Sequence, residues 1–153
     1  MEIDLLKKYP KTKRDLDKRS FEKSDDVIKI AREFGKEFFD GDRKYGYGGF
    51  SYNEKYWNEV VKDFFEYYEL AQDSSILDVG CAKGFMLYDF KKNYPKLKLT
   101  GVDISSYAIQ NSHSEVSDYV KTGDAKDLKF DDNSFDLVIS INTVHNLVLD
   151  DCK

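Results

Sequence analysis

The sequence predicts an α/β fold in which a parallel β-sheet packs against helices. Short apolar runs at 75–79, 97–103, 119–122 and 135–141 have the length and composition of strands. Helical spacing over 85–90, and again from Ser105 to about 112, separates the first three runs. This alternation is typical of parallel strands covered on both faces, and 153 residues suit one such domain.

A helical N-terminal extension is predicted to precede the sheet. Residues 1–52 would form this extension with a lid loop, and 53–153 the sheet domain. Few apolar residues occur before position 25, which predicts a loosely held leader over 1–24. Apolar residues at helical spacing from Val27 to Phe38 predict one helix that ends at the glycine-rich stretch 41–49. A second helix is predicted over about 53–70.

The composition indicates a soluble globular domain. Hydrophobic residues make up 41% and aromatic residues 15% of the chain, too much apolar material for a disordered segment. A net charge of -5 gives a nucleic acid no electrostatic advantage, so that partner is not implied. Neither a membrane span nor an apolar signal core is evident, and we expect a cytoplasmic protein. The two cysteines and two histidines do not have the spacing of a zinc site, so no metal is expected.

Candidate binding residues lie in the turns after the first three predicted strands. Gly80 and Gly84 shape the first turn, but their spacing is not the GxGxxG of dinucleotide sites. Asp103 ends the second strand, where a carboxylate can accept hydrogen bonds from ribose hydroxyls. Asp124 precedes Ala125 after the third strand, an arrangement that suits the edge of an adenine. Each residue alone is typical of a solvated turn, whereas all three turns in order favour an adenosyl ligand.

The chain resembles the class I S-adenosylmethionine-dependent methyltransferases in four segments, which are ILDVGCAKGF (76–85), LTGVDIS (99–105), GDA (123–125) and FDDNSFDLVISINTVHNL (130–147). The resemblance implies S-adenosylmethionine as cofactor, a Rossmann-like sheet, and methyl transfer to an acceptor. The family's sheet has seven strands and this sequence offers about four, so the fold is expected to be incomplete. The alternative is a truncated S-adenosylmethionine-binding module without independent catalytic activity.

The resemblance also implies roles for individual residues. The methionine part would contact the first loop, the ribose the second strand end and the adenine the third loop, with one residue on the floor near the reactive methyl. In that order, the residues are Asp78, Gly80, Ala82 and Gly84, then Asp103 and Ile104, then Asp124 and Ala125, and finally Asn142. Many members carry glycine where this chain has Ala82.

Two further features leave alternatives open. The segment 43–52 resembles the lid of members that act on small molecules or sugar-linked substrates, with Tyr45, Tyr47 and Tyr52 as lid candidates. The same tyrosines could instead pack on the sheet edge. His145 is a candidate general base, or a histidine that packs on the following helix.

An open edge is predicted at the fourth strand. Its apolar run has no later strand to pair with, and unpaired strand edges favour association. We therefore expect a homo-oligomer, or a partner that completes the sheet.

Overall fold

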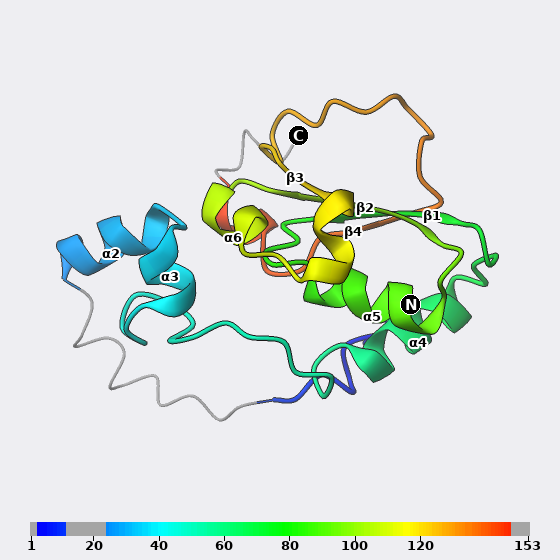
Figure 1. Cartoon of the computed structure of the whole chain (residues 1–153), viewed down its shortest axis with the longest axis horizontal. Helices are drawn as coiled ribbons and strands as arrows, with labels where there is room; N and C mark the ends of the chain where they lie inside the picture. The colour runs from blue at the N-terminus through cyan, green and yellow to red at the C-terminus, as the bar shows by residue number, and fades with distance from the viewer. Residues whose placement is uncertain (1–2, 12–23, 148–153) are drawn as a thin grey trace.

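A computed structural model describes residues 3–11 and 24–147. Its centre is a sheet of four parallel strands in the order β3-β2-β1-β4 (Figure 1). The strands are β1 (Ser75–Val79), β2 (Lys98–Asp103), β3 (Val120–Thr122) and β4 (Leu137–Ile139). Because all four are parallel, their carboxyl ends lie at the same edge. The α/β, Rossmann-like prediction is confirmed.

Helices cover one face of this sheet. On that face α4 (Asn58–Tyr67) packs against α5 (Phe85–Asn93), and the short helices α6 (Ser106–Gln110) and η1 (Ser114–Tyr119) follow β2. The largest core cluster includes Ile76, Leu87 and Phe90, all fully buried. Alternate strand residues face the other side, where Leu77 and Val102 pack under the segment 125–135. In Figure 1 that segment crosses above the sheet, opposite α4 and α5.

Several predicted boundaries shift. Ser105 is the N-cap of α6, as predicted, because its hydroxyl accepts from the amide of Ala108 at 3.0 Å, but the helix ends at Gln110. The helix predicted over about 53–70 begins at Asn58, since Asn53 starts a turn in which its side chain accepts from the amide of Lys55. The fourth strand pairs over only 137–139, and the side chain of Val138 is 57% exposed.

The single helix predicted from Val27 to Phe38 is wrong. The structure has two helices, α2 (Asp25–Arg32) and α3 (Lys36–Asp40). Phe34 lies between them in the left-handed region with φ of 48°, two residues after α2 ends at Arg32, and this conformation prevents the helix from continuing to Phe38. The hydroxyl of Ser105 donates to the backbone oxygen of Phe34 and holds the bend against the sheet domain.

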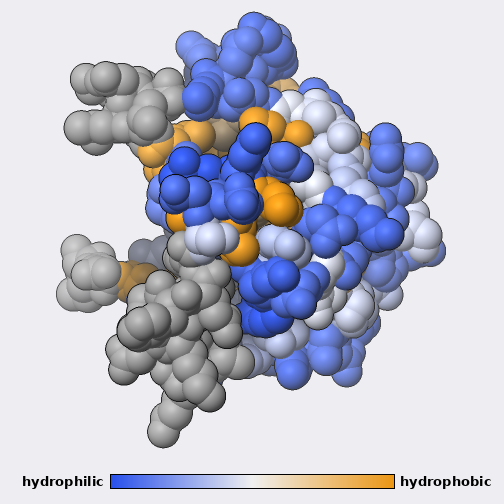
Figure 2. All heavy atoms as spheres, turned by 90° about the vertical axis from the view of Figure 1, so that its left-hand side faces the viewer, coloured by the Kyte–Doolittle hydropathy of each residue, from blue (hydrophilic) through white to orange (hydrophobic). Residues whose placement is uncertain are grey.

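The leader prediction is wrong for residues 3–11. Leu5, Leu6 and Tyr9 pack against the main core, and the ammonium of Lys8 lies 2.7 Å from a carboxylate oxygen of Asp63. Residues 12–23 lie outside the described ranges. No helix within those ranges is long and apolar enough to cross a membrane. On the face shown in Figure 2, hydrophobic residues are exposed in small patches among hydrophilic residues.

Candidate active site

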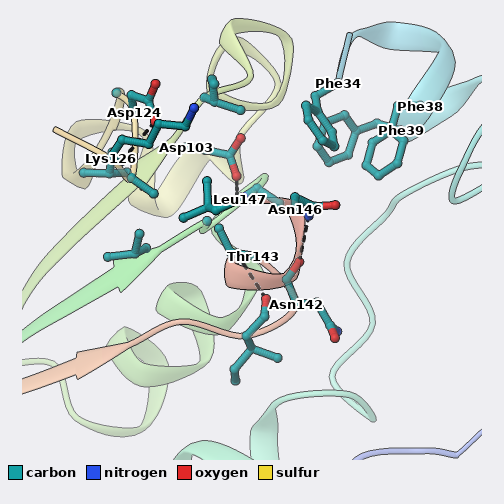
Figure 3. A pocket seen from close by; sticks show the side chains of 18 of the residues that line it. Phe34, Phe38, Phe39, Asp103, Asp124, Lys126, Asn142, Thr143, Asn146 and Leu147 are labelled. Carbon is teal, nitrogen blue, oxygen red and sulfur yellow. Dashed lines mark hydrogen bonds between the residues drawn. The ribbon is translucent and has the colours of Figure 1, made fainter. Parts of the chain in front are cut away.

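A cavity of about 260 Å³ opens at the carboxyl ends of the strands (Figure 3). The loops after all four strands contribute to it, because parallel strands end at the same edge. Most of the residues predicted for the cofactor line it, and so does one lid candidate: Gly80, Ala82, Asp103, Ile104, Asp124, Ala125, Asn142 and Tyr47.

The loop after β1 depends on backbone conformations that favour glycine. Gly80 has φ of 86°, and its amide donates to the carbonyl of Val102 at 2.7 Å. A Cβ at Gly80 would lie 1.8 Å from Oγ1 of Thr143, so glycine lets the loop after β4 approach this closely. Ala82 has φ of 50°, a region where an alanine is strained. Gly84 does not line the cavity but begins α5 with φ of 73°.

Asp103 joins the first two loops. One carboxylate oxygen accepts from the amide of Ala82 at 2.7 Å, and the other accepts from the amide of Ser105 at 2.8 Å. Burial raises the pKa of Asp103, while these two hydrogen bonds oppose the rise. Each carboxylate oxygen can accept about two hydrogen bonds, so both retain capacity for a ligand hydroxyl. The arrangement fits a ribose with two neighbouring hydroxyls.

Asp78 does not line the cavity. Its side chain belongs to β1 and is only 4% exposed. Burial, and then the nearby charge of Asp103, raise its pKa to about 8. Burial, followed by the same two carboxylates, also raises the pKa of the Cys81 thiol. Cys81 therefore stays protonated, consistent with a turn residue rather than a nucleophile.

The loops after β3 and β4 complete the polar side. Asp124 accepts from the amide of Lys126 at 3.0 Å, which fixes the turn that presents Ala125. Asn142 has φ of 58° and is exposed at the cavity. Sequence reasoning missed the neighbouring lining residues, which are Lys126, Thr143, Asn146 and Leu147.

An aromatic wall closes the opposite side, and sequence reasoning missed most of it. We give this name to Phe34, Phe38, Phe39 and Tyr47, all of which line the cavity. The ring centroids of Phe38 and Tyr47 are 5.3 Å apart, and Phe39 stacks on Tyr47 at 5.8 Å. The available signal was Gly35, which interrupts the helical pattern just before two adjacent phenylalanines.

The other predicted site residues lie outside the lining. The Tyr52 hydroxyl donates to Asp89 at 2.6 Å, and the Tyr52 ring packs edge-on against Tyr88 of α5. Burial, and then this hydrogen bond, raise the pKa of Tyr52. Tyr45 does not reach the cavity, and His145 lies exposed on η2 (Val144–Asn146). Over 3–11 and 24–147, no group of three His, Cys, Asp or Glu residues is placed to hold a metal ion.

Comparisons with known proteins point to one family. Residues 76–153 match the model described as "Methyltransferase domain". A Priestia megaterium protein named malonyl-[acyl-carrier protein] O-methyltransferase is 28% identical over 100 residues, which cover 60% of this chain and 34% of that protein. The mouse protein named arginine-hydroxylase NDUFAF5, mitochondrial, is 31% identical over 80 residues, or 51% of this chain and 23% of its own length.

A solved structure shows the same fold. The phosphoethanolamine N-methyltransferase 2 of Haemonchus contortus, in complex with phosphomonomethylethanolamine and S-adenosylhomocysteine, superposes with a TM-score of 0.57 at 20% identity. That likeness covers 80% of this chain and 31% of the Haemonchus contortus protein. The chain thus spans about a third or less of the length of each of these three proteins.

Proposed function

The chain belongs to the methyltransferase domain family, the class I S-adenosylmethionine-dependent enzymes, and we propose that it transfers a methyl group to a small-molecule or sugar-linked acceptor. S-adenosylmethionine is the cofactor. It supplies a methyl group on a positively charged sulfur. In the transfer, the acceptor's nucleophile would bond to the methyl carbon as the carbon–sulfur bond breaks, and the sulfur would keep the electron pair.

One observation carries the proposal: the carboxylate of Asp103 is fixed by the amides of Ala82 and Ser105 at the mouth shared by all four loops. From there it would hold the ribose hydroxyls. Asp124 and Ala125 would take the adenine, and the turn at Gly80 leaves room for the methionine part.

The chain's contribution to the reaction would be mainly positioning. Asn142 would form the floor near the reactive methyl, and the aromatic wall would exclude water from it. His145 does not line the cavity, so we assign it no direct part in proton removal. An acceptor whose nucleophile is a hydroxyl would then lose its proton to water.

A cofactor-binding module without turnover of its own is the second candidate. The observation that favours it is the short match to the curated relatives, 34% and 23% of their lengths.

Calorimetric titration with S-adenosylmethionine and S-adenosylhomocysteine tests the shared premise. Asp103→Ala removes the carboxylate that would accept hydrogen bonds from the ribose hydroxyls. Losing a hydrogen bond to a charged group costs about 1.5–3 kcal/mol, which is roughly a ten- to hundredfold loss of affinity for the cofactor. Asp132→Ala, at an exposed position outside the cavity, is the matched control. Equal affinity in the two variants would contradict the site.

Turnover separates the two candidates. Labelled S-adenosylmethionine would be incubated with panels of hydroxyl, amine and carboxylate acceptors. Labelled product that disappears in Asp103→Ala supports the methyltransferase. Cofactor binding without product from any panel favours the binding module.

A further inference from the structure

A second cavity, of about 310 Å³, shares one of its described lining residues, Tyr47, with the cofactor cavity. It forms where residues 3–11 run along the loop that precedes α4, two segments that lie side by side in Figure 1. Six aromatic side chains line it, and we call it the aromatic cavity: Tyr9, Tyr47, Phe50, Tyr56, Trp57 and Phe85. The ring of Tyr9 lies 4.8 Å from that of Trp57 and 5.4 Å from that of Tyr56, centroid to centroid.

The two cavities adjoin at Tyr47, which lines both. Its ring stacks on Phe39, on the cofactor side, at a centroid distance of 5.8 Å. The same ring lies 4.3 Å from Phe50, which lines the aromatic cavity, and the rings of Phe39 and Phe50 are themselves 5.6 Å apart, so the three rings form one cluster. Phe85 also lines the aromatic cavity, and it is the first residue of α5, directly after the loop that follows β1. A ligand in the aromatic cavity would therefore lie against the same tyrosine that lines the cofactor cavity.

Arg43 gives the aromatic cavity its charge. It is the one Lys, Arg, Asp or Glu among the described residues that line this cavity. One guanidinium nitrogen donates to the backbone oxygen of Gly46, and the guanidinium has further N–H donors for a ligand. Aromatic faces favour a flat ring, and a guanidinium favours a carboxylate or phosphate.

We propose that the aromatic cavity binds a flat aromatic anion and is the acceptor subsite of this chain. The ring of the ligand would lie among Tyr9, Trp57 and Phe50, with its anionic group toward Arg43. The acceptor role rests on the proposed methyltransferase function, whereas the binding itself does not. In the transfer, a hydroxyl oxygen on the ligand would bond to the methyl carbon, the sulfur would keep the electron pair of the broken bond, and the hydroxyl proton would pass to water.

Trp57 offers a direct readout, because it is the chain's single tryptophan and lines the aromatic cavity but not the cofactor cavity. The probe is 4′-hydroxybiphenyl-4-carboxylate, and its carboxamide is the neutral counterpart. We expect saturable quenching of Trp57 by the carboxylate, and calorimetric affinity about three- to tenfold above that of the carboxamide, a modest factor because Arg43 is exposed. Absence of quenching, or equal affinity for both compounds, would overturn the proposal.

Two variants locate the probe. Arg43→Gln should remove the preference for the carboxylate, while Lys44→Gln, at the exposed neighbour outside the aromatic cavity, should keep it. Ser51→Leu fills part of the cavity from an exposed position and should weaken both compounds. If Lys44→Gln lowers the affinity as much as Arg43→Gln does, the charge assignment is wrong.

Titrations with the cofactor, alongside those with the probe, test this proposal separately from the proposed function. Asp103→Ala should weaken S-adenosylmethionine and leave the probe's affinity unchanged. Competition between probe and S-adenosylhomocysteine would place the probe in the cofactor cavity and overturn the proposal. Labelled methyl transfer to the 3′- or 4′-hydroxy isomer, reduced in Arg43→Gln, supports the acceptor role. Binding without product from either isomer overturns that role alone.

Discussion

The ammonium nitrogen of Lys83 lies 2.7 Å from Oδ2 of Asp40 and joins the loop after β1 to α3, the helix that carries Phe38 and Phe39. Lys83 is buried, and it also donates to the backbone oxygen of Phe50 at 2.9 Å. Asp40 accepts in addition from the hydroxyl of Tyr107 at 2.7 Å. The aromatic wall is thus attached to the cofactor loop through a charge pair next to the cavity.

Asp40→Asn should loosen the aromatic wall. The change leaves the buried ammonium of Lys83 without its counter-ion, and losing a hydrogen bond to a charged group costs about 1.5–3 kcal/mol. We expect a lower free energy of unfolding in urea and faster proteolysis within 33–50. Lys129→Met, which breaks the exposed pair with Asp127, is the control and should change stability by less than about 0.5 kcal/mol. If both variants change the free energy of unfolding and the proteolysis rate by similar amounts, the Lys83–Asp40 pair does not stabilise the aromatic wall.

The same pair predicts loss of stability in acid. Partial burial raises the pKa of Asp40, but the hydrogen bonds from Lys83, the Phe50 amide and Tyr107 outweigh it and lower the pKa to about 2. A pKa lowered in the folded chain means stability that is present above the usual value near 3.8 and lost as pH falls toward 2. The urea midpoint of the unchanged chain should fall as the pH is lowered from about 5 to about 2. In Asp40→Asn it should fall less steeply over the same range. Parallel curves for the two proteins would contradict the assignment.

The sheet and the loops that line the cavity after its strands could be predicted from the sequence because their signals are local. An apolar run such as Ile76–Val79 and the glycine after it lie within a few residues of each other, and this pattern located β1 and its turn. The aromatic wall could not be predicted in the same way. Its position depends on a bend at Phe34 and on Asp40 meeting Lys83 from 43 residues away, and no short-range pattern encodes either.

The tyrosines of the lid prediction divide for a similar reason. Tyr47 lines the cavity while Tyr52 donates to Asp89, yet both occur in the same glycine- and tyrosine-rich stretch. The sequence pattern around the two tyrosines is the same, so it does not distinguish them. Only the contacts of Tyr52 with α5 show that its role differs from that of Tyr47. Whether Tyr47 closes over a bound cofactor stays a prediction, which hydrogen exchange with and without S-adenosylhomocysteine would test.

Ala82→Gly should stabilise the chain. Ala82 has φ of 50°, where a Cβ is unfavourable, and glycine adopts this conformation without strain. After allowing for the greater freedom of glycine in the unfolded chain, we expect a net gain of about 0.5–1 kcal/mol in the free energy of unfolding. Ala71→Gly, at an exposed position without positive φ, is the control and should lose stability. A loss in Ala82→Gly of the same size as in the control would mean that the strain is absent.

The protonation of Asp78 should affect first the stability of the free chain and then its affinity for the cofactor. Burial, and then the charge of Asp103, raise the pKa of Asp78 to about 8, so its carboxyl is mainly protonated in the free chain at neutral pH. A pKa raised in the folded chain also means that stability is greatest below the usual value near 3.8 and declines as pH rises toward 8. This window lies above that of Asp40, so the free chain should lose stability through Asp40 as pH falls from 3.8 toward 2 and through Asp78 as pH rises from 3.8 toward 8.

A bound amino group changes this balance. Asp78 directly precedes Val79 and Gly80, which line the cavity, and the resemblance implies that the cofactor's ammonium would lie beside it. A positive charge there favours the carboxylate, so binding should release a proton and affinity should rise with pH until about 8, by at most about tenfold per pH unit. Titrations at one pH in phosphate and Tris would give different observed enthalpies, and the difference counts the protons released. Asp78→Asn should abolish that difference, whereas Asp132→Asn should keep it. If the wild-type enthalpies agree between the two buffers, Asp78 does not change its protonation when the cofactor binds.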